Sequence, residues 1–437
     1  MKKESIEHAI GMIDHIINEQ VNQILHHPDF QQLESSWRGL MMLINCASEG
    51  QHVIIRMLNV SLNLLSKDLN QAIEFDQSQI FKKVYTEEFD QPGGTPYGLL
   101  IGDYYFSHKS TVDSHDNIRT LSLLAKIASA SFSPFISGTD SNLFGLDSYE
   151  ELSPNLNISQ LLKQEEYTRW QKLRQDEDTR FIGLTLPRIL MRNTYNQNGV
   201  KLRHRNFKEI VHSNKDILWG NPAYAYACTV IQCFQETGWF TDIRGVNSST
   251  RTGGTTHLAR HYYSTDAKPL LAAPSTEVLI TDNQEKRLSD IGVMALSDEP
   301  LSEKSIFYSS QSMHITKSYT TTAGTINSQL SSMLHYILSS CRFAHYIKII
   351  MRDKVGSFMS ANECERYIKN WINKYCAASE NMTETSRAKY PLNEAKIKIE
   401  QNPGNPGLYQ CTMHLKPHDQ LDNIQSHLTF VTKIKKH

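Results

Sequence analysis

The chain has 437 residues, with 45 Lys and Arg against 46 Asp and Glu, and its formal net charge is -1. Such balanced charge argues against a general nucleic-acid binder, which would carry a basic excess, and against an acidic disordered tail. At roughly 100–200 residues per domain, the length predicts two or three domains with ordinary globular cores.

The first 27 residues are predicted to form an amphipathic helix, because apolar residues recur at spacings of three and four. These residues are Ile6, Ile10, Ile13, Ile17, Val21 and Ile24. A second helix is expected after Pro28, with Asp29 as its N-cap. Its apolar stripe consists of Phe30, Leu33, Trp37, Leu40 and Ile44. The two stripes favour two helices packed together with a shared core, and exposed partner-binding helices are the alternative.

Strands alternate with helices through the centre of the chain, which predicts an α/β core. The expected strands are 53–58, 97–103, 135–138, 181–186 and 277–280. The expected helices are 62–75, 78–88, 120–130, 152–174, 221–237 and 282–290. The polar, basic segment 192–216 is expected to be a surface excursion, and 247–256 a loop.

The last third of the chain has a different pattern. Two amphipathic helices are predicted, at 329–353 and 364–375, and three strands follow at 395–400, 408–416 and 427–433. We therefore divide the chain into an N-terminal helical segment (1–48), a central α/β domain (49–285) and a C-terminal domain (286–437). The fold class is mixed α/β, with sheets flanked by helices.

No catalytic, metal or cofactor motif is found. The sequence lacks the phosphate-binding GxxxxGK[ST] loop, the GxSxG nucleophile elbow and the zinc-binding HExxH pair. Its seven cysteines are scattered without a CxxC pair, which fits reduced thiols in a cytoplasm. The longest apolar runs are far shorter than the roughly 20 residues of a membrane-spanning helix, and the N-terminus does not resemble a signal peptide.

Several segments, taken in order along nearly the whole chain, resemble the large subunit of the type VI secretion contractile sheath, the TssC/VipB family. The segments are HHPDFQQLESSWRGL (26–40), GGTPYGLLIGDYYFSH (93–108), RFIGLTLPRILMR (180–192), LWGNPAYAYA (218–227), GWFTDIRGV (238–246), TEVLITDNQEKRLSDIG (276–292), CRFAHYIKIIMRDKVGSF (341–358) and NPGNPGLYQCTMHLKPHDQLDNI (402–424). The segment 247–273 departs from the acidic, glycine-rich loop usual in the family.

The resemblance implies a structural, non-enzymatic protein of the bacterial cytoplasm. Such a subunit pairs with a small sheath subunit (TssB/VipA family), polymerises with its own copies around an inner tube (Hcp family) on a baseplate, and contracts to drive the tube through a target membrane. A baseplate or adaptor protein of the same machine, and an α/β enzyme without local motifs, are the alternatives. Family members usually carry a longer N-terminal extension that a recycling AAA+ unfoldase grasps, so recycling is not expected here.

The resemblance also suggests which residues make contacts between subunits. The C-terminal strands are expected to join an intersubunit sheet, through Leu408, Tyr409, Cys411, Met413, Leu415, Leu428, Phe430 and Thr432. The helix 364–375 and the flanking loop 353–362 are expected to face the tube, through Glu365, Arg366, Lys369 and Asn373. Four arginines among glycines and aromatics are expected to pair with carboxylates or carbonyls inside the subunit. They are Arg38, Arg188, Arg244 and Arg342.

Overall fold

The computed structural model describes residues 2–48, 53–109, 116–152, 156–195, 207, 209–245, 253–263, 271–299, 304–317, 319–355, 361–377, 386, 389–401, 408–418 and 428–435. A six-stranded sheet forms the centre of this described part. Its strands, in spatial order, are β1 (Leu100–Phe106), β2 (Phe135–Thr139), β3 (Ile182–Leu186), β9 (Val293–Asp298), β10 (Ser305–Phe307) and β6 (Thr255–Thr256). The first four strands are parallel, and β10 and β6 complete the sheet in antiparallel pairs.

Both faces of this sheet are buried, because successive side chains of a strand point to opposite sides. Val293 and Ala295 of β9 enter one apolar cluster, and Met294 and Leu296 enter the other. The first cluster is covered by α3 (Leu62–Gln71), α4 (Gln79–Phe81), α5 (Asn117–Ser131), α6 (Ile158–Leu161), α7 (Thr168–Arg174) and α9 (Asp282–Asp290). The second is covered by α8 (Ala223–Thr237) and the start of α11 (Leu334–Val355). The predicted mixed α/β class is confirmed.

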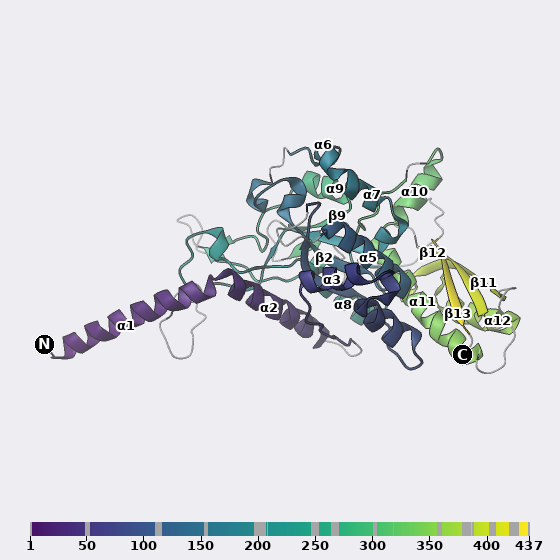
Figure 1. Ribbon diagram of the computed structural model, residues 1–437, viewed down its shortest axis with the longest axis horizontal. Coiled ribbons are helices and arrows are strands. Elements are labelled where there is room, and N and C mark those ends of the chain that lie inside the picture. Colours follow the sequence, from purple (N-terminus) through teal and green to yellow (C-terminus); the bar gives the residue numbers. More distant parts are fainter. Residues whose placement is uncertain are drawn as a thin grey trace.

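The N-terminal helices lie outside this core. Helix α2 (Pro28–Ser48) packs on α8, and α1 (Lys2–Leu25) extends away from the body with the N-terminus at its far end (Figure 1). The expectation that the two helices bury their apolar stripes against each other is therefore wrong. Helix α2 begins at Pro28, so Asp29 lies in its first turn, and the Asp29 N–H donates to His27 Nδ1 (3.3 Å).

The face that α2 buries is not its most apolar face. Ser35, Gly39 and Leu43 are buried towards α8. A Cβ atom at Gly39 would lie 2.4 Å from the ring of Tyr224, so only glycine permits this close approach of the two helices. The helix therefore contacts the body through Ser35, Gly39 and Leu43 and leaves Leu33, Trp37 and Met41 exposed.

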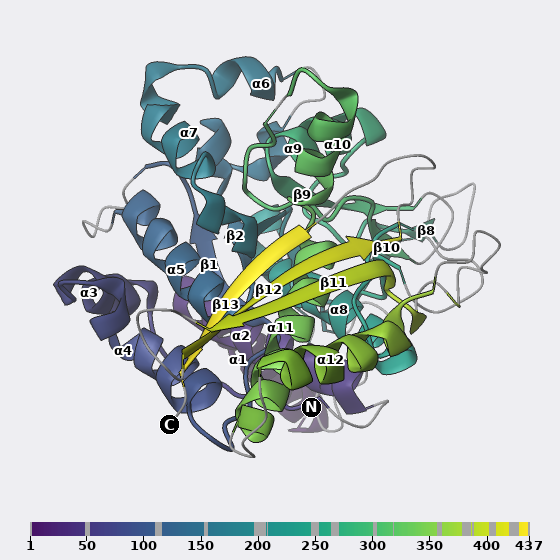
Figure 2. The ribbon, with the colours of Figure 1, turned by 90° about the vertical axis from the view of Figure 1, so that its right-hand side faces the viewer.

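The C-terminal part forms a third apolar cluster. The strands β11 (Leu392–Gln401), β12 (Leu408–Pro417) and β13 (Leu428–Lys435) form an antiparallel sheet in that order. This sheet packs against the second half of α11 and against α12 (Ala361–Ile372), as Figure 2 shows at the end of the molecule facing the viewer. The three strands agree with the predicted ones. Helix α10 (Thr322–Leu330) precedes α11.

Several predictions for the central region are wrong. Residues 53–58 are extended but pair with no described strand, and 277–280 form no strand. The helix expected at 152–174 is broken, because Gln164 has extended backbone angles between α6 and α7. Strands β9 and β10 were not predicted. The remaining short strands pair as β4 (Ile189–Leu190) with β5 (Trp219–Gly220), and β7 (Tyr262–Tyr263) with β8 (Leu271–Ala272). The π-helix Lys82–Asp90 continues α4.

Candidate assembly interface

Helix α1 presents a row of exposed apolar side chains, which we name the α1 seam: Ile6, Ile10 and Ile13. Their exposed fractions are 60%, 52% and 56%. The spacings of four and three are those of the seam of a left-handed coiled coil. Exposed apolar rows on this scale mark surfaces for protein interaction, because an isolated soluble chain gains nothing from keeping them in water.

A second exposed row, the α2 stripe, consists of Leu33, Trp37, Met41 and Ile44. The first three side chains are each 56% exposed. These residues also recur at three and four, on the side of α2 turned away from the buried Ser35, Gly39 and Leu43. Trp37 is a large aromatic residue of the kind that contributes most to binding when a partner covers it.

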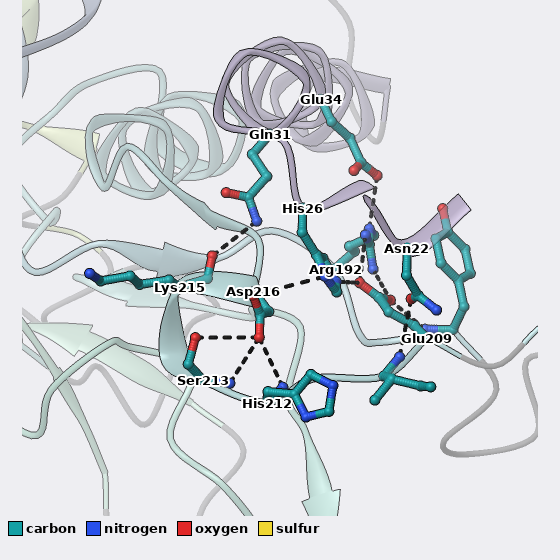
Figure 3. A network of polar contacts seen from close by, with 12 residues as sticks. Asn22, His26, Gln31, Glu34, Arg192, Glu209, His212, Ser213, Lys215 and Asp216 are labelled. Carbon is teal, nitrogen blue, oxygen red and sulfur yellow. Dashed lines mark hydrogen bonds and ion pairs between the residues drawn. The ribbon is translucent and has the colours of Figure 1, made fainter. Parts of the chain in front are cut away.

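A buried polar network fixes the junction between α1 and α2 (Figure 3). Arg192 is only 6% exposed and donates through Nε to Glu34 Oε1 of α2 (2.8 Å). Its Nη1 and Nη2 donate to the two carboxylate oxygens of Glu209 at 2.6 and 3.1 Å. His26 Nε2, at the end of α1, lies 3.3 Å from Glu209 Oε1. Arg192 thus connects α2 to Glu209, and Glu209 contacts His26 just after the end of α1.

Backbone contacts strengthen the same junction. Asn22 Oδ1 of α1 accepts the Ile210 N–H (3.1 Å), and Gln31 Nε2 of α2 donates to the Lys215 carbonyl (3.1 Å). Asp216, whose Oδ1 lies 3.9 Å from His26 Nδ1, is held by backbone N–H groups of its own turn. The network sets the direction in which α1 leaves the body, and therefore where the α1 seam is presented.

Glu209 is charged in this network despite its burial. Burial alone would raise the pKa of its carboxyl, but hydrogen bonds from Arg192 and from the Tyr195 N–H outweigh burial and hold the pKa below its ordinary value of 4.5. Arg192 supplies a full positive charge at hydrogen-bonding distance, which favours the ionised carboxylate.

The network should therefore stabilise the chain at neutral pH and lose this effect in acid. Because the folded-state pKa of Glu209 lies below its unfolded value, the contribution is complete above about pH 4.5 and is lost as the pH falls through the folded-state pKa. Between pH 7 and pH 3, the midpoint temperature of thermal unfolding should fall more steeply for the wild-type chain than for Glu209→Gln. Parallel curves would contradict this assignment.

The C-terminal strand residues divide between an internal and an edge role. Cys411, Met413 and Leu415 are buried against the helices of this chain, and β12 pairs with β11 on one side and β13 on the other. Leu408 and Tyr409 also lie on β12, in register with Lys435 and Ile434 of β13. An added strand from another subunit can pair only with a free edge, so β12 itself has no edge to offer.

Two backbone groups on the outer side of β11 are bonded within this chain. The Ile399 N–H donates to Glu365 Oε2 of α12 (3.0 Å), and the Ala377 N–H donates to the Leu392 carbonyl (2.9 Å). On β13, Leu428, Phe430 and Thr432 lie in register with β12, and no described strand pairs with the outer side of β13. Among the described residues, two groups on the outer side of β11 are thus held by other parts of this chain, and β13 forms the other edge of the sheet.

Helix α12 buries Cys364, Ile368 and Ile372 and exposes a polar face, as its periodicity predicts. Arg366, Lys369 and Asn373 are exposed. Glu365 is half-buried because it holds the Ile399 N–H, so a role for it in facing the tube competes with this contact. Residues 356–360 of the loop expected to flank this face lie outside the described part.

The four arginines singled out in the sequence have different surroundings. Arg38 donates to Glu34 (2.7 Å), and Arg188 forms a two-pronged ion pair with Glu277 (2.6 and 2.7 Å). Arg244 Nη1 contacts the Met333 sulfur at 3.9 Å. Arg342 differs from the expectation, because its guanidinium lies over aromatic rings, with the Phe234 centroid at 4.3 Å and that of Tyr346 at 4.8 Å.

The residues that anchor α1 were missed in the sequence. Arg192 and Glu209 fall in 192–216, which was predicted to be a surface excursion, yet both are buried. The pair is formed by residues 17 positions apart that share no helix or strand, so no periodicity connects them. Phe207 in that polar segment is also buried. In the described residues, no helix is long and apolar enough to cross a membrane, and no cluster of metal-ligating side chains is present.

Comparisons with known proteins agree with this architecture. A family model described as the EvpB/VC_A0108 tail sheath N-terminal domain matches residues 7–314, and one described as the tail sheath gpW/gp25-like domain matches residues 323–434. The type VI secretion system sheath protein TssC1 of Pseudomonas aeruginosa is 38% identical over 436 residues, which cover 99% of this chain and 86% of that protein.

Two consecutive sheath domains over a central α/β sheet and a C-terminal strand module define a tail sheath protein. The chain belongs to the VipB family of type VI secretion system sheath proteins and is a structural sheath subunit. The family resemblance predicted from the sequence is confirmed.

Proposed function

We propose that this sheath subunit pairs with a small sheath subunit of the TssB/VipA family, and that the α1 seam and the α2 stripe receive an amphipathic helix of that partner. The observation that carries this proposal is the exposed 4-3 spacing of Ile6, Ile10 and Ile13 on a helix that extends from the body. A helix with a matching seam would cover both rows through knobs-into-holes packing.

The charge of α1 specifies the partner further. Among its residues are four carboxylates and two lysines, namely Glu4, Glu7, Asp14, Glu19, Lys2 and Lys3. An acidic helix selects a partner whose flanking positions are basic, because opposite charges beside a coiled-coil seam favour pairing and like charges oppose it. The proposed partner helix therefore has an apolar seam flanked by Lys or Arg.

The double change Ile10→Glu with Ile13→Glu should abolish this pairing. Burial of one isoleucine contributes about 1.5–3 kcal/mol, so loss of two should weaken binding at least about a hundredfold. Glu is a better helix former than Ile, so α1 itself should persist. Co-purification of a tagged small subunit from cells that express both chains measures the effect.

The matched control is His8→Glu with His15→Glu, which adds the same two charges to the opposite face of α1. This control should retain the partner. Equal retention by both double variants would show that the α1 seam is not the docking surface, and equal loss would show that charge alone disrupts the complex.

We further propose that a strand of a neighbouring sheath subunit adds to the open edge of β13, which links subunits into a helical polymer. Strand addition suits a moving assembly, because many backbone hydrogen bonds act in parallel. The proposed polymer surrounds an inner tube of the Hcp family, stands on a baseplate and contracts to propel the tube. Within it, the exposed residues Arg366 and Lys369 of α12 and Asn373 directly after it are proposed to face the tube.

The role proposed here is mechanical, in the bacterial cytoplasm, and includes no catalytic step or cofactor. The division into 1–48, 49–285 and 286–437 is proposed as a division of tasks. The first part carries the helical docking surface and the second most of the rigid core. The third supplies β9 and β10 of that core together with the linking strands and the tube-facing helix.

A further inference from the structure

Two cysteines from distant parts of the chain lie side by side where α2 packs on α8. Cys46, in the last turn of α2, and Cys228, in the middle of α8, are separated by 182 positions, and their Sγ atoms lie 2.8 Å apart. Both sulfur atoms are in the thiol form. A disulfide requires an S–S distance of about 2.05 Å, so the two sulfur atoms need to approach by less than about 1 Å.

The surroundings hold these two sulfur atoms together. Leu43, Tyr224 and Ala227 form a buried apolar cluster with Cys228, and Cys46 packs against it. Gly39, about two helical turns before Cys46, fits against the Tyr224 ring. Directly after Cys46, the Ala47 carbonyl accepts a hydrogen bond from Gln235 Nε2 (3.0 Å). The helices are thus fixed on both sides of the pair, which keeps the thiols from separating.

The two thiols differ in access. Cys46 is half-buried and Cys228 is buried. The hydrogen bond with Cys46 and burial hold the pKa of the Cys228 thiol well above its usual value, so Cys228 is unreactive towards outside reagents by itself. An oxidant therefore meets Cys46 first, with Cys228 already in place as the second sulfur.

We propose that Cys46 and Cys228 form a disulfide when a hydroperoxide oxidises the chain, and that this bond fastens α2 to the body. The Cys46 thiolate attacks the peroxide oxygen, an S–O bond forms as the O–O bond breaks, and water or an alcohol leaves after taking up a proton. The Cys228 sulfur then attacks the Cys46 sulfur, the S–S bond forms, and the sulfenic oxygen leaves as water with the Cys228 proton. Two thiols are oxidised and one hydroperoxide is reduced.

The consequence follows from what α2 carries. Its outer side bears the α2 stripe, and its first residue follows directly on the turn that ends α1. A covalent bond across the α2–α8 contact removes the possibility that α2 lifts from the body without global unfolding. The inference does not depend on which partner covers these helices.

Hydrogen peroxide treatment of the full-length chain, followed by blocking of free thiols with N-ethylmaleimide and digestion without reductant, tests the proposal. Mass spectrometry should find the Cys46 and Cys228 peptides joined, two hydrogens lighter than their sum, and separated again by dithiothreitol. Cys376→Ser, which removes another half-buried cysteine, should cross-link like the wild type, and Cys46→Ser should not.

Thermal unfolding of the same samples supplies an independent readout. Oxidation should raise the midpoint temperature of unfolding for the wild type and for Cys376→Ser, and dithiothreitol should reverse this rise. The midpoint temperature of Cys46→Ser should not rise. Full alkylation of Cys228 after peroxide treatment and unfolding, or conversion of Cys46 to sulfinic acid without a joined peptide, would overturn the disulfide. A joined peptide without any rise in the midpoint would overturn the fastening of α2.

Discussion

Replacing Arg192 by Ala is expected to lower the free energy of unfolding by about 3–5 kcal/mol, because it leaves two carboxylates without their shared cation in a buried site. Glu209 is 1% exposed and Glu34 12% exposed, and Glu34 keeps Arg38 as a partner, so the larger loss falls on Glu209. The damage should be concentrated at the root of α1 and α2, which Arg192 connects to the Glu209 segment.

Urea unfolding measures the loss, and limited proteolysis locates it through new cleavage between α1 and α2. The matched control is Arg38→Ala, which also removes a partner of Glu34 but from a side chain that is 36% exposed, and should cost only about 0–1 kcal/mol. In the Arg192→Met background, Glu209→Gln should recover part of the stability, since it removes the uncompensated charge. Equal losses for the two Arg→Ala variants would show that the network is not an anchor.

The sequence predicts the helix α2 correctly, but it does not predict which side of the helix is buried. The pattern Phe30, Leu33, Trp37 and Ile44 is apolar and regular, and in a monomer such a stripe normally faces the core. In this chain the contact with α8 is made by Ser35, Gly39 and Leu43. A partner that covers the α2 stripe would explain why it faces outward. The sequence of this chain alone does not contain that partner.

The missed parts of the core share one physical cause, which is their dependence on distant segments. Strand β9 becomes a central strand through parallel pairing with β3, more than 100 positions earlier. The contacts of Arg192 and Glu209 with Glu34 and His26 form only when the N-terminal helices lie beside them. Local patterns predicted α5, α8, α9 and the C-terminal strands, because each of these has its signal within its own residues.

The sequence also could not say which edge of the C-terminal sheet is open. The alternation along β12 predicts a strand equally well at the centre or at the edge of a sheet. The answer depends in part on α12, whose Glu365 accepts the Ile399 N–H on the outer side of β11. Glu365 was selected from the sequence for its charge on a polar helix face, and its contact with β11 is a property of the packed structure.

Removal of β13 is expected to abolish assembly of the sheath while the body remains folded. Truncation after Gln425 deletes the strand proposed to pair with a neighbouring subunit and moves the free edge back to β12, one strand position away from the proposed contact. The central six-stranded sheet is separate from the C-terminal sheet, so its unfolding transition should be retained. The truncated chain should still bind the small subunit through the α1 seam, which lies at the opposite end of the molecule (Figure 1).

Negative-stain microscopy of the chain co-expressed with its small subunit measures this effect. The full-length pair should form tubules, and the pair with the truncated chain should give separate heterodimers. A truncation after Lys435, which keeps all of β13, is the control and should assemble normally. Normal tubules from the chain that ends at Gln425 would show that the β13 edge is not the link between subunits, because a strand that is absent cannot donate or accept the hydrogen bonds of an intersubunit sheet.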